Sequence, residues 1–383
     1  MKILTPLLVL TYVLNKAELP VVTSKMASLV NTFGVCDEAA SAYCYRGSFA
    51  SNLKVIDAHA KFAKEIMDRS KDRYSKAASK MYILCLLSHT RDIRWVQKGY
   101  EENYHYSLQV GDIQVALLSF MYVLYYSLVT GYSLASTAEE SRDTIRSLKL
   151  KYGGWQVGLM AVLWQGVLNL QGKSEDPLVL KGEAIDETVM DPATPDTVDG
   201  ALRIGFKAII YAFCGSHQAN ADENMERIQD VASRLKGNGI AFWFEIYTAI
   251  SCLHCARSAG RKSAAKYRKF GQQISKEVKK RIAQGCANVK QLDHLLDAEL
   301  AVLAGDESNA RRSYKKSIKI AEKMLLVNDA GMASERLGEY LLEGGDKAGA
   351  RESLSRAIEF YSLWGSELKV ESIRCKYEAL LRQ

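Results

Sequence analysis

Proline is scarce in this chain, with five residues in 383, and three of them (Pro177, Pro192 and Pro195) fall in one short stretch. Because proline interrupts the hydrogen bonding of a helix, a chain this poor in it can run long helices almost everywhere else. The sequence also lacks a run of the ~20 apolar residues that a membrane-spanning helix needs. We therefore expect a soluble, helical protein that makes no contact with a membrane.

Signatures of catalysis and nucleotide binding are missing as well. The chain contains neither GxxxxGK[ST] nor GxGxxG, and its six histidines are scattered, with no recognisable triad segment. Cys252 and Cys255 would share a helical face, but no second Cys or His pair at suitable spacing completes the four ligands of zinc. We expect no catalytic residue, no metal and no cofactor, and hence a protein that is not an enzyme.

The cysteines and the N-terminus predict the location. Eight cysteines in a long chain, mostly inside apolar helical runs, are typical of buried thiols in a reducing compartment. The run ILTPLLVLTYVL after Lys2 is similar to a signal-peptide core, but no small-x-small cleavage site follows it. The prediction is a buried first helix and a cytoplasmic protein.

Apolar residues recur at helical spacing nearly throughout, and no segment convincingly predicts a strand. The pattern predicts helices over 2–14, 21–33, 37–47, 52–69, 74–88, 93–110, 113–131, 136–150, 154–171, 198–214, 220–236, 239–258, 261–284, 288–304, 307–326, 329–343, 347–362 and 366–382.

An internal repeat is the most informative pattern. A Gly-Asp pair followed by Ala four residues after the Asp occurs three times in one frame: Gly111, Asp112 and Ala116; Gly305, Asp306 and Ala310; and Gly345, Asp346 and Ala350. Glycine can end one helix in a left-handed conformation, aspartate can cap the next, and a small alanine lets two helices approach closely. The prediction is an all-α fold of antiparallel helix pairs stacked as a right-handed solenoid of the tetratricopeptide (TPR) kind.

One acidic stretch interrupts this pattern. Residues 171–200 hold eight acidic and two basic residues, which leaves a net charge of +13 on the rest of a chain whose formal charge is +7. We predict an N-terminal helical array over 1–172, an acidic, proline-containing connection over 173–198, and a C-terminal TPR-like array over 199–383. The basic excess indicates solvated helix faces rather than a nucleic-acid surface.

Two segments resemble a known family. LNLQGKSEDPLVLKGEAIDETVM (Leu168–Met190) and AIEFYSLWGSELKVESIRCKY (Ala357–Tyr377), with a repeat boundary at Trp364-Gly365, are similar to the helical region of large signal-transduction ATPases of the AAA/STAND kind. In that family, kinase-like and ATPase domains precede a long TPR-like arm. The resemblance implies the arm alone, with protein partners that include an ATPase or kinase module.

Three hypotheses follow. The first is a scaffold or regulatory arm in signal transduction that binds proteins through its inner groove; candidate groove residues, expected to be exposed, are His294, Glu299, Arg336 and Glu339. The second is a piece of a multidomain signalling ATPase or kinase whose ATP-binding and kinase activities lie outside this chain. The third is a basic helical module that binds nucleic acid.

Overall fold

A computed structural model describes residues 1, 3–13, 18–151, 154–235 and 237–382. Over these residues the protein is all-α, which confirms the predicted fold class. They contain no strand, only an isolated antiparallel bridge between Lys181 and Asp186 and the short 3-10 helix η1 (Glu187–Val189).

The helices fall on both sides of the acidic connection. Those before it are α1 (Leu4–Val13), α2 (Leu19–Phe33), α3 (Ala39–Ser48), α4 (Leu53–Arg69), α5 (Arg73–Leu87), α6 (Ile93–Val110), α7 (Ile113–Val129), α8 (Leu134–Lys151) and α9 (Trp155–Leu170). Those after it are α10 (Val198–Cys214), α11 (His217–Asn224), α12 (Arg227–Arg234), α13 (Gly239–Cys255), α14 (Arg261–Ala283), α15 (Lys290–Ala304), α16 (Glu307–Lys323), α17 (Val327–Glu343), α18 (Lys347–Trp364), α19 (Glu367–Lys376) and α20 (Glu378–Leu381).

The predicted helices agree with these bounds to within about three residues, except in two places. The helix predicted over 220–236 is two helices, α11 and α12, and the one predicted over 366–382 is divided into α19 and α20. Tyr377 lies at the second break, where its φ of −118° and ψ of 23° leave helical geometry and its hydroxyl donates to Glu339 at 2.7 Å. Residues 2, 14 and 236, at the ends of predicted helices, lie outside the described residues.

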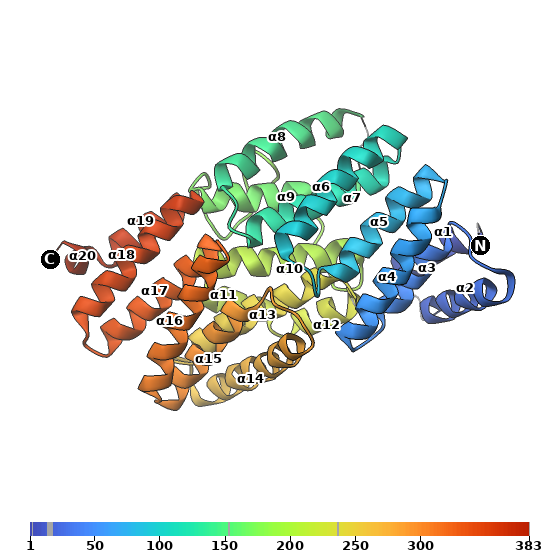
Figure 1. Cartoon of the computed structure of the whole chain (residues 1–383). Coiled ribbons are helices and arrows are strands. Elements are labelled where there is room, and N and C mark those ends of the chain that lie inside the picture. The colour runs from blue at the N-terminus through green and yellow to red at the C-terminus, as the bar shows by residue number, and fades with distance from the viewer. Residues whose placement is uncertain (2, 14–17, 152–153, 236, 383) are drawn as a thin grey trace.

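Neighbouring helices pack together along most of the chain, and alternate helices also touch. Contacts of this second kind join α1 to α3, α3 to α5, α5 to α7, α7 to α9, α13 to α15 and α15 to α17. These helices therefore form a shared layer, as expected when helix pairs that cannot bury their own apolar faces stack. Figure 1 shows an elongated molecule with its termini at opposite ends. The right-handed superhelical turn of a TPR-like solenoid stays a prediction.

The helices before and after the connection also meet end to end. Polar side chains just before or at the start of α15, α17 and α19 donate to backbone carbonyls in the turn after α5 and at the last residues of α7 and α9. Asn288 donates to Arg91 at 2.7 Å, Asn328 to Val129 at 3.2 Å and Ser366 to Leu170 at 2.9 Å. The partners are 197, 199 and 196 residues apart, so the two sets of helices meet in register. A helix leaves its last backbone carbonyls without a partner inside the helix, and at the ends of α7 and α9 Asn328 and Ser366 supply the donors.

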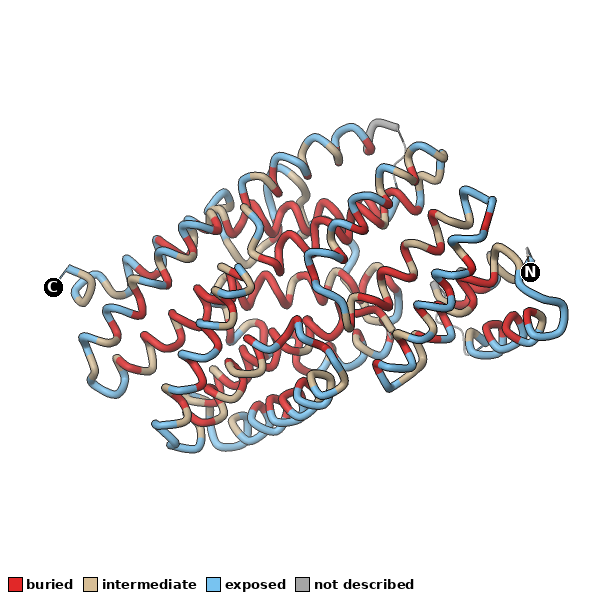
Figure 2. The backbone as a smooth tube through the Cα atoms, viewed as in Figure 1, coloured by how far each residue is buried: buried red, intermediate tan, exposed pale blue. Residues whose placement is uncertain are grey.

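The core is continuous across this junction. One cluster of buried side chains extends from Val30 to Ile373, and Figure 2 shows buried backbone running through the middle of the molecule. The acidic connection packs on the same body, because Asn169 donates to the carbonyls of Pro177 and Val179 at 3.1 and 2.9 Å. The predicted division into two arrays stays a prediction.

None of the described helices is both long and apolar enough to cross a lipid bilayer.

Candidate functional site

The three Gly-Asp turns share one geometry. Their glycines have φ values of 83°, 72° and 82°, in the left-handed region that a residue with a Cβ enters only at a cost. Each aspartate accepts a hydrogen bond from the backbone N–H three residues later, at 3.2, 3.0 and 3.0 Å, and each alanine is fully buried. The residues concerned are Gly111, Asp112 and Ala116; Gly305, Asp306 and Ala310; and Gly345, Asp346 and Ala350.

The predicted boundary at Trp364-Gly365 ends α18. Gly365 has a φ of 88°, and Trp364 is fully buried with its ring 5.0 Å from that of Phe213 in α10. The next residue, Ser366, makes the hydrogen bond to Leu170 described above. Trp364 is thus a core anchor beside the junction of the two sets of helices.

A fourth turn has the same hydrogen bonds without a glycine. The N–H of Leu325 donates to Glu322 and that of Leu326 to Ala321, matching the bonds that Gly305 and Asp306 make to Val302 and Ala301. Leu325 has a φ of 56° and a side chain that is 64% exposed. A leucine therefore occupies a left-handed position that favours glycine.

Three of the four predicted groove residues lie together, because Arg336 pairs with both Glu299 and Glu339, but they do not form an open face. Glu299 and Arg336 are 0% and 2% exposed, so the expectation that they are exposed is wrong. The side chain of Glu339 is only 11% exposed, and His294 is partly exposed. Glu299 and Arg336 are buried because they neutralise each other between α15 and α17, which allows both charges to leave water.

Glu299 is the centre of a buried hydrogen-bonded cluster. Arg336 donates to it through Nε at 3.0 Å and Nη2 at 3.2 Å, and Arg257 donates at 2.8 Å. The hydroxyl of Tyr314 adds a fourth bond at 2.8 Å. Both carboxylate oxygens are saturated, so Glu299 has no lone pair left for a substrate. These bonds join α15, α16, α17 and the turn after α13.

A second carboxylate extends the cluster to the C-terminus. Glu339 accepts from Arg336 at 3.1 Å, from Lys376 at 2.8 Å and from Tyr377 at 2.7 Å. One turn earlier on α17, Glu335 accepts from Lys369 at 2.7 Å and from Tyr361 at 2.8 Å. Glu335 and Glu339 therefore tie α17 to α18, to α19 and to Tyr377, the residue after α19.

Protonation states in this cluster are fixed by burial and by the neighbouring charges. Burial alone would raise the pKa of Glu299, but the guanidinium groups of Arg336 and Arg257 lower it well below its usual range. Burial and Arg336 lower the pKa of His254 to about 3, and burial lowers that of His217 well below its usual value. Both imidazoles are neutral near pH 7, with their ring centroids 4.7 Å apart. The cluster holds helices together and offers no base with a pKa near 7.

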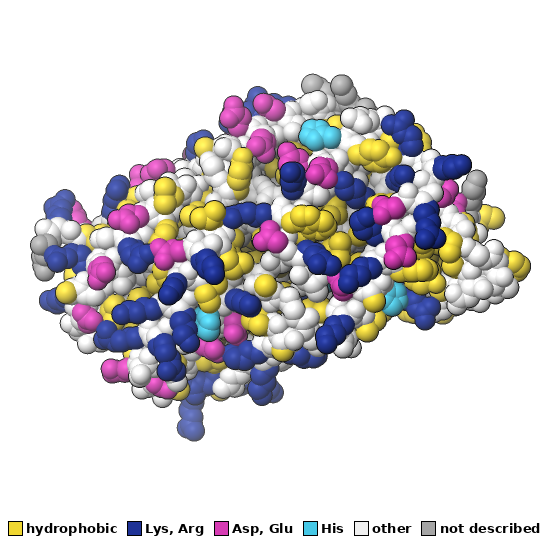
Figure 3. Space-filling model, in the orientation of Figure 1, with side chains coloured by type: hydrophobic (Ala, Val, Ile, Leu, Met, Phe, Trp, Pro, Cys, Tyr) yellow, Lys and Arg dark blue, Asp and Glu magenta, His cyan; other side chains and the backbone are white. Residues whose placement is uncertain are grey.

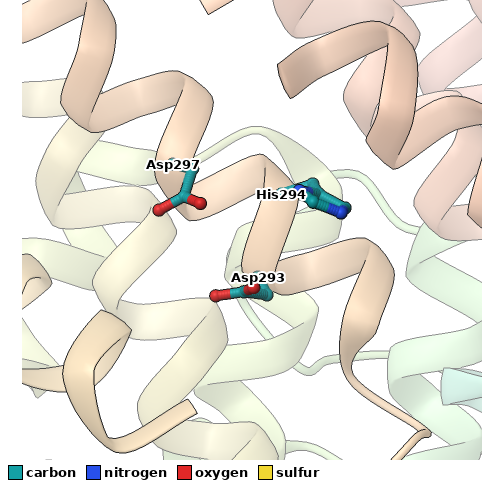
Figure 4. A group of neighbouring side chains, drawn as sticks. All are labelled: Asp293, His294 and Asp297. Atoms are coloured by element: carbon teal, nitrogen blue, oxygen red, sulfur yellow. The ribbon is translucent and has the colours of Figure 1, made fainter. Parts of the chain in front are cut away.

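A group that could bind a metal lies on α15. Single ligand atoms of Asp293, His294 and Asp297 lie within 4.8 Å of one another. Figure 4 shows the His294 ring pointing away from the side on which the two carboxylates lie. The ammonium of Lys279 pairs with both carboxylates, at 3.2 Å from Asp293 and also with Asp297. Lys279 therefore already supplies the positive charge that a metal ion would bring.

Positive charge is concentrated on α14, an outer helix. Its 23 residues include nine basic side chains and one acidic one. Lys262, Lys269 and Lys276 are exposed, recur every seven residues and so follow one stripe of the helix. Among the described residues, no carboxylate lies within ion-pair distance of these three ammonium groups.

A second basic stripe lies on α16, which packs against α15, as α14 does. Arg312, Lys316, Lys319 and Lys323 follow one another at spacings of three or four residues, and all are exposed. Figure 3 shows Lys and Arg side chains gathered over the region where Figure 1 places α14 and α16. We call the stripes on α14 and α16 together the basic face.

From the sequence alone, the basic excess was interpreted as solvated helix faces and was not assigned to particular helices. The seven-residue spacing of Lys262, Lys269 and Lys276 was visible and could have indicated a stripe. The placement of a second stripe on the next outer helix required the structure.

Comparisons with known proteins give no relationship. No protein-family model matches the chain, and no curated protein matches it.

Proposed function

We propose that this protein is a non-catalytic helical-repeat scaffold that binds an acidic surface of another protein through the basic face. In keeping with the resemblance to the helical arm of STAND-type ATPases, the proposed setting is cytoplasmic signal transduction, with an ATPase or kinase module as the partner.

The observation that carries this proposal is the unpaired charge on α14 and α16, two helices that both pack against α15. The buried carboxylates of Glu299 and Glu339, by contrast, are paired within the chain, with Arg336 and with the hydroxyls of Tyr314 and Tyr377. On the basic face, Lys269 and Lys276 have no carboxylate partner in the described part of the chain. A face of one sign attracts a partner of the opposite sign and sets its orientation.

Nucleic-acid binding is the second candidate, because phosphate groups would satisfy the same lysines. The aromatic side chains of α14 and α16 do not support a single-stranded ligand, since Tyr267, Phe270 and Tyr314 are buried and cannot stack on bases. The exposed lysines of the basic face could still contact the phosphate backbone of a duplex. The first candidate predicts that the chain retains a protein from native extract, and the second predicts that it retains nucleic acid.

Charge reversal tests the proposal. The variant Lys269→Glu with Lys276→Glu is compared with Lys25→Glu with Lys71→Glu, which reverses two exposed lysines, one on α2 and one just before α5. Each protein is used to capture partners from native extract, with and without nuclease, and the retained proteins are quantified by mass spectrometry. We expect a protein that wild type and the control retain equally, that nuclease leaves in place, and that the α14 variant loses by at least tenfold.

Two results would overturn the proposal. If wild type and the α14 variant retain the same proteins in equal amounts, the basic face is not the binding surface. If the captured material disappears on nuclease treatment, the face binds nucleic acid, and the second candidate takes its place.

A further inference from the structure

An apolar cavity of about 410 Å³ lies on the layer of alternate helices. Its walls come from α1, α3, α5, α7 and α9, from the start of α10, and from the Gly237-Asn238 turn before α13. Open apolar cavities of this size are typical of sites that bind small molecules.

The lining is neutral. None of the described lining residues is charged, and most are aliphatic, aromatic or sulfur-containing. Four tyrosines, Tyr12, Tyr45, Tyr82 and Tyr122, contribute to it; the ring of Tyr45 lies 5.5 Å from that of Tyr12 and 4.9 Å from that of Tyr82. Transferring a charged ligand into such a site would cost its hydration without a compensating ion pair. Aromatic walls favour a flat, apolar ligand.

One polar group in the wall is placed to orient an occupant. The amide of Asn238 donates to the hydroxyl of Tyr122 at 2.7 Å, and the thiol of Cys85 lies 4.0 Å from the same oxygen. Burial raises the pKa of Tyr122 well above its usual value and that of Cys85 to about 11, so both keep their protons. Because Asn238 already donates to Tyr122, the phenol hydrogen can be directed to an acceptor, which is either the Cys85 sulfur or a group on the ligand.

The cavity also spans the junction of the two sets of helices. Gly237 has a φ of 82°, and a Cβ there would collide with Ser48 at the end of α3. Its carbonyl lies 3.4 Å from Nε2 of His89, just after α5. A molecule in the cavity would therefore touch α3, α5 and α7 on one side and the turn leading into α13 on the other.

From this geometry we infer that the cavity is a binding site for an uncharged, flat, largely apolar small molecule that carries a hydrogen-bond acceptor for Tyr122. By contacting both sets of helices, the ligand stabilises their junction. This inference goes beyond the scaffold function and does not depend on it.

Binding is measured with the full chain and Nile red, a neutral aromatic dye with a carbonyl acceptor. We expect a saturable, blue-shifted fluorescence signal at one dye per chain. Methyl 2-naphthoate should displace the dye at a concentration at least tenfold lower than 2-naphthoate at pH 7.5, because the two share a ring system and differ in charge. Equal displacement by ester and carboxylate would contradict the inference.

Ala78→Trp places an indole into the cavity and should weaken dye binding at least tenfold. Ala265→Trp, which adds the same group at an exposed position on α14, is the matched control and should bind as wild type does. Equal binding by the two variants would place the dye elsewhere.

A second measurement needs no variant and so does not depend on how Ala78→Trp folds. Peptide mass spectrometry follows the alkylation of wild-type cysteines by N-ethylmaleimide. Saturating methyl 2-naphthoate should slow the modification of Cys85, which lines the cavity, at least tenfold, and leave that of the exposed Cys375 unchanged. Unchanged modification of Cys85 at saturation would overturn the inference.

Discussion

Arg336 donates two hydrogen bonds to Glu299, from Nε to Oε1 at 3.0 Å and from Nη2 to Oε2 at 3.2 Å. The two residues are 37 positions apart and lie on α15 and α17, the alternate helices of successive pairs. Both side chains are buried, so the pair forms in a medium of low polarity, where losing one partner is costly.

Replacing one member of this pair should therefore destabilise the fold strongly. In Glu299→Gln the guanidinium of Arg336 stays buried against a neutral amide, and we expect the free energy of unfolding to fall by about 3–5 kcal/mol. Glu322→Gln removes a partly exposed carboxylate that pairs with Arg356 and should cost less than about 1 kcal/mol. Urea unfolding of the two variants measures the difference; equal losses would contradict the buried-pair interpretation.

A substitution at Leu325 should stabilise the fold. At a φ of 56° a leucine is strained, and its exposed side chain loses few contacts on removal. Leu325→Gly should raise the free energy of unfolding by about 1 kcal/mol, whereas Gly305→Ala at the matching turn should lower it by about 1 kcal/mol. Both changes are measured by urea unfolding. Destabilisation by Leu325→Gly would show that the leucine makes a contribution that the strain does not outweigh.

Asp329 predicts a dependence of stability on pH. The residue is 1% exposed, accepts from Tyr247 at 2.8 Å and from Gln291 at 2.9 Å, and burial raises its pKa from 3.8 to about 6. Between pH 4 and 6 the folded protein keeps a proton that the unfolded chain releases. The contribution of Asp329 to the free energy of unfolding is therefore greatest below pH 4. It falls by about 3 kcal/mol in total as the pH rises to 6.

Asp329→Asn carries no titrating group and should lose that slope. The measurement is the free energy of unfolding of wild type and variant at pH 4, 5, 6 and 7, with the variant gaining on wild type across this range. If the free energies of unfolding of wild type and Asp329→Asn change in parallel with pH, the slope does not come from Asp329.

Local patterns were enough to predict most helices and their turns. Apolar spacing places α6 at Ile93–Val110 and α10 at Val198–Cys214 with the bounds that the structure has. The helix break at Tyr377 escaped prediction, because its hydroxyl bonds with Glu339, 38 residues away. Apolar periodicity continues across that break and carries no signal of it.

The functional surfaces were harder to predict, since they depend on residues far apart in sequence. Charged residues are exposed by default, so Glu299 and Arg336 were expected on a groove until their mutual pairing showed them buried. The bond from Asn328 to Val129 spans 199 positions and has no local signature. The cavity has the same origin, because its walls come from separate helices and one distant turn.

The central claim, that the basic face binds a protein, is tested most directly by site-specific photo-crosslinking in native extract. A photoreactive benzoylphenylalanine replaces Gln272, an exposed residue on α14 between Lys269 and Lys276, and in a second protein replaces the exposed Glu139 on α8. The account predicts a nuclease-resistant protein adduct from position 272 that is absent from position 139 and lost in Lys269→Glu with Lys276→Glu. Identical adducts from both positions, or no protein adduct from position 272, would contradict it.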